Sequence, residues 1–181
     1  FALKASDEVG NVSPLSSCPS CPVRTLTSSD TTRPGQITDL AVVSATKDTM
    51  TLCWTAPADN GTDLASGLAT EYDVRYSTRR IVDDGVTSGV GEVVFSGAPM
   101  AQVIEGLAPP KQIGLKECYL VAVTNDIDTG GGIIDNRIWN TRFYFAVKTL
   151  DEARNKSLLS NIAGGLTVLK PYAYNTVSVP Y

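Results

Sequence analysis

A segment of this chain occurs twice, and the repeat constrains the fold more than any other feature of the sequence. Residues 1–17 and residues 145–161 match at nine of seventeen positions, with a constant offset of 144 residues. The matches include Asp7-Glu8 with Asp151-Glu152. Such a density of matches predicts one supersecondary unit present in two copies. The spacing is long for a solenoid repeat and suits whole domains arranged in series.

The two copies set the expected domain boundaries. The second copy closes a complete unit, so we predict a full domain over residues 34–169 and a C-terminal tail over residues 170–181. The first copy, residues 1–17, is then the last two strands of a preceding domain. Residues 18–33 are rich in Ser, Thr and Pro, which is typical of a linker. Because an isolated hairpin is marginally stable, residues 1–17 require strands from upstream sequence or from another chain.

Short alternating segments separated by turn residues predict a β-sandwich for residues 34–169. The clearest is Thr49–Thr55, in which Met50, Leu52 and Trp54 alternate with threonine and cysteine. No segment shows a sustained helical period. The other predicted strands are Gln36–Ser44, Glu71–Ser77, Val93–Phe95, Gln102–Leu107, Arg142–Leu150, Leu158–Ile162 and Leu166–Leu169.

Five segments of this region occur in an order that carries a family resemblance. They read PGQITDLAV, TMTLCWTAP, EYDVRYS, QVIEGLAPP and TRFYFAVKTLDEARNKSLLSNIA. In this order they resemble successive strands of a fibronectin type III domain. The variant is similar to secreted bacterial modules and to the C-terminal module of the calcium-activated chloride channel regulator family. The resemblance implies an all-β, immunoglobulin-like sandwich in which Trp54 is the buried tryptophan of the second strand.

The sequence departs from the family pattern after the GLAPP segment. The family places a corner tyrosine a few residues later, whereas the matching strand here begins only at Arg142, and Phe143 stands at the tyrosine position. We therefore predict an insertion over residues 111–141. A structureless loop of this length would be unusual, so we expect a hairpin in which Cys118–Val123 pairs with Ile133–Trp139.

Four cysteines in a chain with secretory features predict two disulfides. Cys53 points away from the side of Trp54 and needs a surface partner, for which we predict Cys118. Cys18 and Cys21 are then left to pair with each other or to brace the linker against a neighbour. Free thiols and a metal site are the alternatives. One CxxC motif cannot complete a four-ligand zinc site without a second pair or a histidine.

The residue types argue against catalysis. Histidine is absent from the sequence, so a Ser-His-Asp triad cannot form within the chain. The acidic pairs Asp83-Asp84 and Asp151-Glu152 are expected to diverge, since neighbouring residues on a strand point to opposite faces. Asp126 and Asp128 faintly resemble a calcium loop but lack its acidic twelfth position. We therefore predict no catalytic residue, no cofactor and no metal ligand.

Charge and hydropathy limit the partners. The chain has 15 basic and 19 acidic residues and no basic block, so nucleic acid is not expected as a partner. No apolar run approaches the ~20 residues that span a bilayer. Sequons begin at Asn11, Asn60 and Asn155, and N-linked glycans are predicted there if the source is eukaryotic. Asn11 and Asn155 occupy the same position in the two copies of the repeat, where an asparagine can also be explained by the turn that it forms.

The C-terminal tail is apolar, aromatic and poor in charge. It is expected either to lie on its own domain or to add as a strand to a sheet edge of another subunit. We therefore predict an extracellular structural or adhesive module of a larger protein, assembling with itself or with neighbouring domains. The alternative is an accessory binding module of a secreted hydrolase, protease or surface receptor. The predicted assembly residues are Phe1, Tyr172, Tyr174, Val177, Val179 and Tyr181.

Overall fold

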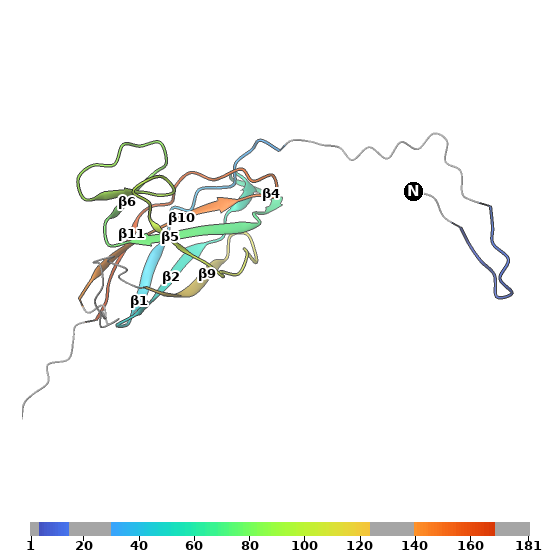
Figure 1. The fold of residues 1–181 in the computed structure, drawn as a ribbon, viewed down its shortest axis with the longest axis horizontal. Coiled ribbons are helices and arrows are strands. Elements are labelled where there is room, and N and C mark those ends of the chain that lie inside the picture. Colours follow the sequence, from blue (N-terminus) through green and yellow to red (C-terminus); the bar gives the residue numbers. More distant parts are fainter. Residues whose placement is uncertain (1–3, 15–29, 124–139, 169–181) are drawn as a thin grey trace, which may run out of the picture.

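The computed structural model describes residues 4–14, 30–123 and 140–168. Two sheets form the body of the sandwich, with strand orders β1-β2-β9 and β11-β10-β5-β8, and every neighbouring pair within them is antiparallel (Figure 1). The first sheet contains β1 (Ala41–Ala45), β2 (Thr49–Thr55) and β9 (Lys116–Ala122); the second contains β5 (Glu71–Ser77), β8 (Gln102–Ile104), β10 (Arg142–Leu150) and β11 (Ala163–Leu166).

The core lies between the two sheets and follows the predicted alternation. Met50, Leu52 and Trp54 of β2 are fully buried. The Trp54 ring stacks on Tyr119 of β9 at 4.9 Å and meets Tyr72 of β5 edge-on at 5.0 Å. Burial of each large apolar side chain contributes about 1.5–3 kcal/mol. The inner faces of the sheets are therefore joined through the tryptophan that the family resemblance singled out.

Three predicted strands, Thr49–Thr55, Glu71–Ser77 and Arg142–Leu150, have the predicted bounds. The prediction of a strand over Leu158–Ile162 is wrong. Beside this segment, the side-chain hydroxyls of Ser157 and Ser160 accept hydrogen bonds from the backbone N–H groups of Thr149 and Val147, each at 2.9 Å. These hydroxyls take the place of strand carbonyls, and the last strand begins only at Ala163.

The first part of the expected insertion is a strand of the sandwich. The segment Lys116–Ala122 is strand β9, which pairs with β2 along its whole length. Tyr119 lies opposite Leu52 and Val121 lies opposite Met50, so both point into the core. The other predicted arm, Ile133–Trp139, lies outside the described residues.

The predicted bond between Cys53 and Cys118 is present. The two residues are direct partners in the β2–β9 ladder, with their Cα atoms 4.2 Å apart. Cys53 is only 3% exposed, whereas Cys118 is exposed, so the bond reaches the surface through Cys118. Cys18 and Cys21 lie outside the described residues.

The described chain carries an additional strand pair between β5 and β8, which is called the elaboration below. Here β6 (Arg80–Val82) and β7 (Glu92–Val94) pair in parallel and fold beside β5 and β10 (Figure 1). This elaboration has a small core of its own against β10, made by Ile81, Val93, Phe95, Ala101 and Ala146.

The duplicated sequence forms the same hairpin twice. A bridge joins Ser6 to Val12 in the first copy, and a bridge joins Leu150 to Lys156 in the second, at the same offset of 144 residues. In each copy an aspartate, Asp7 or Asp151, accepts hydrogen bonds from the backbone and side-chain nitrogens of an asparagine four residues later. The four distances lie between 2.7 and 2.8 Å. The repeat is therefore a repeat of conformation as well as of sequence.

Candidate functional site

The linker meets the sandwich beside a small hairpin formed by β3 (Ala58–Asn60) and β4 (Asp63–Leu68). The N–H of Gly35 donates to the carbonyl of Ala58, and the N–H of Gly61 donates to the carbonyl of Arg33, each at 2.9 Å. A Cβ atom on Gly35 would collide with the carbonyl oxygen of Gly61. The close approach of the hairpin and the segment that follows the linker thus requires glycine at position 35.

An acidic cluster lies at this end of the molecule. It consists of Asp30 at the end of the linker, Asp59 on β3 and Glu152 in the turn after β10. One carboxylate oxygen from each residue lies within 4.8 Å of the other two. Among the described residues this is the one such group of three or more potential metal-binding side chains. Carboxylates without histidine or cysteine suit a hard cation such as Ca²⁺ or Mg²⁺.

Asp59 is the most unusual member of the acidic cluster. Its side chain is 5% exposed, and its Oδ1 atom is buried without a hydrogen-bond partner in the described part of the chain. Burial raises the pKa of this carboxyl, and the negative charges of Glu152, Asp151 and Asp30 raise it further. A buried carboxylate without a compensating partner destabilises the folded state.

Asn155 connects the turn after β10 to the linker. Its Nδ2 atom donates to Oδ2 of Asp151 and to the carbonyl oxygen of Asp30, both at 2.8 Å. A glycan would be attached through this same nitrogen. Nδ2 of Asn11 donates to Asp7 in the same way, and Oδ1 of Asn60 is buried. Glycosylation at the three sequons stays a prediction, with the Nδ2 atoms of Asn11 and Asn155 already in use for their turns.

The two acidic pairs behave differently, and only Asp83-Asp84 departs from the expected divergence. Asp151-Glu152 lies in a loop rather than on a strand, so Glu152 can join the acidic cluster. Asp83 and Asp84 converge on Nζ of Lys148, at 2.6 and 2.7 Å. Both pairs lie beyond strand ends, where the alternation of strand side chains does not apply.

Lys148 is buried against the elaboration between β5 and β8, with its Nζ 5.2 Å from the centre of the Phe95 ring. Burial by itself would lower the pKa of Lys148, but the hydrogen bonds to Asp83 and Asp84 outweigh it and raise the pKa. Desolvation would raise the pKa of Asp84, but hydrogen bonds from Lys148 and Ser96 lower it to about 2. A lysine held in its charged form is not a nucleophile, so this group has a structural role.

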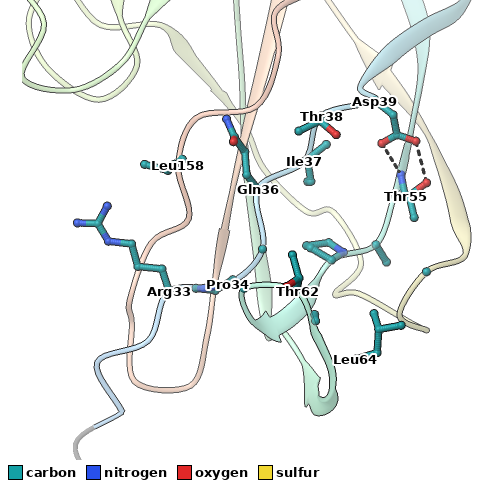
Figure 2. Close-up of a pocket in the computed structure, with 16 residues that line it drawn as sticks. Arg33, Pro34, Gln36, Ile37, Thr38, Asp39, Thr55, Thr62, Leu64 and Leu158 are labelled. Carbon is teal, nitrogen blue, oxygen red and sulfur yellow. Dashed lines mark hydrogen bonds between the residues drawn. The ribbon is translucent and has the colours of Figure 1, made fainter.

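A groove of about 940 Å³ opens beside the linker (Figure 2). Its wall is mainly apolar and includes Leu64 and Leu158, which are 70% and 51% exposed. Asp39 lies in the wall and accepts hydrogen bonds from the backbone nitrogen and the hydroxyl of Thr55, at 3.0 and 2.7 Å (Figure 2). These bonds outweigh the desolvation of Asp39 and lower its pKa. The groove therefore holds a carboxylate that is already satisfied.

No family model and no curated protein matches the chain. Among solved structures, it is similar to the fibronectin type III domain of human fibronectin type III domain containing protein 3, with a TM-score of 0.43, 16% identity, and coverage of 79% of this chain and 94% of that chain. It is also similar to titin module A71 from human cardiac muscle, with a TM-score of 0.38, 15% identity, and coverage of 73% and 86%. The described strands themselves form an all-β sandwich of two antiparallel sheets. These likenesses concern the fold alone.

The sandwich brings together residues that the sequence patterns did not. Asp30, Asp59 and Glu152 were not predicted to form a site, because 122 residues separate the first from the last. Two sequence features could have pointed to this cluster. They are the repeated Asp-Glu pair and the aspartate just before the Asn60-Gly61 turn. Of the predicted assembly residues, Phe1 and the five in the tail lie outside the described residues. None of the described residues forms a helix with the length and apolarity of a membrane span.

Proposed function

We propose that this chain is a non-catalytic structural or adhesive module of a larger secreted or cell-surface protein, in which such sandwiches follow one another every 144 residues. The observation that carries the proposal is the duplicated hairpin. Its two copies share their bridge position, their aspartate–asparagine hydrogen bonds and their offset. A unit that recurs with its hydrogen bonds intact is expected at the same place in each of two successive domains.

Two further features support this function. The Cys53–Cys118 disulfide suits an oxidising, extracellular environment. The end of the linker is also held to the sandwich, because Gly61 donates a backbone hydrogen bond to Arg33 and Nδ2 of Asn155 donates to the carbonyl of Asp30. These contacts fix the end of the linker to the sandwich that follows it.

Self-assembly by strand addition is a second candidate, favoured by one edge of the sandwich. Among the described strands, β9 has a neighbour on one side only, and Leu120 on this strand is 71% exposed. An open strand edge is a template for another strand. The apolar tail, residues 170–181, has the alternation and low charge that such an added strand needs.

Limited proteolysis of the full-length native parent protein, followed by mass spectrometry, tests the main proposal. Cleavage in linkers equivalent to residues 18–29 should release fragments of about 144 residues in a regular ladder. A single sandwich attached to an unrelated catalytic domain would contradict the array and favour the accessory-module alternative.

Sedimentation velocity tests the second candidate. Chain 1–181 should associate at high concentration, and a version ending at residue 168 should remain monomeric. A monomeric full chain would contradict strand addition without affecting the main proposal.

A further inference from the structure

We propose that Asp30, Asp59 and Glu152 bind a calcium ion at the junction between the linker and the sandwich. The three carboxylates come from three separate segments, namely the linker, strand β3 and the turn after β10. A bound ion would therefore connect parts of the chain that the sequence places far apart. This inference stands whether or not the module belongs to a tandem array.

The spacing of the acidic cluster suits one calcium ion. Calcium binds oxygen at about 2.3–2.6 Å, so two of its ligands lie at most about 5 Å apart. The three carboxylate oxygens lie within 4.8 Å of one another and fit around a single ion. Magnesium demands shorter bonds of about 2.0–2.1 Å and stricter geometry, and it usually keeps several waters. Zinc is disfavoured because the acidic cluster contains no histidine or cysteine.

The state of Asp59 points to a cation independently of the spacing. The residue is 5% exposed, and Oδ1 is buried without a hydrogen-bond donor in the described part of the chain. The charged groups that act on it, Glu152, Asp151 and Asp30, are all negative. No ion pair within residues 30–123 and 140–168 involves these four acids. A divalent cation supplies the missing positive charge.

The proposed ligands are held in place by the fold. Asp59 lies between two residue pairs of the β3–β4 ladder, Ala58 with Leu68 and Asn60 with Asp63. Glu152 follows Asp151, whose carboxylate is fixed by both nitrogens of Asn155.

Asp30, the proposed calcium-binding residue of the linker, is also held in place. The carbonyl of Asp30 accepts a hydrogen bond from Asn155, and its Oδ1 accepts one from the N–H of Thr32 at 2.8 Å. Glu152 is exposed and Asp30 is partly exposed, so water can complete the six to eight ligands that calcium takes.

Calorimetric titration of chelator-treated chain 1–181 with calcium chloride tests the site. The expected result is one ion per chain, with magnesium binding at least about tenfold more weakly. At a free calcium concentration 100 times the Kd, the melting temperature should rise by about 5–10 °C. Absence of saturable binding at millimolar calcium, or equal binding of magnesium, would overturn the proposal.

Two substitutions and one matched control separate the site from general attraction to an acidic protein. Asp59→Asn and Glu152→Gln should each weaken calcium binding by at least about tenfold. The control is Glu8→Gln, because Glu8 is the exposed counterpart of Glu152 in the first hairpin and belongs to no acidic cluster among the described residues. Its affinity should equal that of the unmodified chain.

Glu152 is exposed, so its substitution leaves the fold intact even if Asp59→Asn perturbs it. Equal affinities for Glu152→Gln and Glu8→Gln would overturn the assignment of Glu152 and with it the proposed site.

Discussion

Cys53 and Cys118 face each other in the β2–β9 ladder and are joined by a disulfide that closes a loop across 65 residues of sequence. The bond fixes β9 to the central strand of its sheet. It also secures Lys116–Ala122 to the sandwich.

Replacement of both cysteines by serine, Cys53→Ser with Cys118→Ser, should lower the free energy of unfolding by about 2–4 kcal/mol, since the unfolded chain regains the entropy of a long loop. Urea unfolding followed by tryptophan fluorescence measures the loss. The control, Cys18→Ser with Cys21→Ser, leaves the strand disulfide in place and should change the stability of the sandwich by less than about 0.5 kcal/mol. A loss of equal size in the control would contradict the assigned role of the Cys53–Cys118 bond.

Lys148→Met should destabilise the module by about 2–3 kcal/mol, because it leaves Asp83 and Asp84 side by side without a cation. The matched control is Lys4→Met, since Lys4 is the exposed counterpart of Lys148 in the first hairpin. Chemical denaturation of the two variants provides the comparison. An equal effect of both substitutions would show that the buried ion pair adds nothing to stability.

The ion pair between Lys148 and Asp84 also affects how the stability of the fold changes at low pH. The pKa of Asp84 falls from its usual 3.8 to about 2 in the folded state, so its stabilising contribution is complete above pH 3.8. It is lost as the pH falls from 3.8 towards about 2. The expected size is about 1 kcal/mol once solvent screening is allowed for. Thermal melts between pH 2 and pH 5 should show a shallower acid limb for Asp84→Asn than for the unmodified chain, and an unchanged limb would contradict this.

Asp59 should have the opposite pH dependence. Its pKa is raised in the folded state, so its stabilising contribution is present below pH 3.8 and is lost as the pH rises through the folded pKa. At pH 7 and without divalent cations, Asp59→Asn should therefore raise the free energy of unfolding by about 1–3 kcal/mol. The control Asp63→Asn, at an exposed position on β4, should stay within about 0.5 kcal/mol of the unmodified chain. Destabilisation by Asp59→Asn would show that the carboxylate has a favourable partner in the apo state.

Gly35→Ala should separate the start of the domain from the β3–β4 hairpin, because the added Cβ collides with the backbone carbonyl of Gly61. We expect a loss of about 1–3 kcal/mol and faster amide hydrogen exchange at Gly35 and Gly61. The control is Gly164→Ala, where a Cβ would have its nearest neighbour at an ordinary 3.6 Å. Unchanged exchange at Gly61 in Gly35→Ala would contradict the tight junction.

Strands and core positions that depend on local alternation could be predicted from the sequence. Met50, Leu52 and Trp54 could be predicted to point inward because side chains on a strand have a period of two residues. The duplicated hairpin followed from direct comparison of one part of the sequence with another. The partner of Cys53 was also predictable, since few cysteines were available.

Which distant segments meet could not be predicted in this way and depends on the tertiary fold. Strand β9 has an alternation that suits an added hairpin as well as a sheet strand, and its pairing with β2 is decided by contacts across the core. Asp30, Asp59 and Glu152 carry no shared local pattern, and the folding of the linker, β3 and the turn after β10 onto one end of the sandwich brings their carboxylates together. Periodicity is a property of neighbouring residues, whereas a cluster of like charges depends on how the whole chain closes on itself.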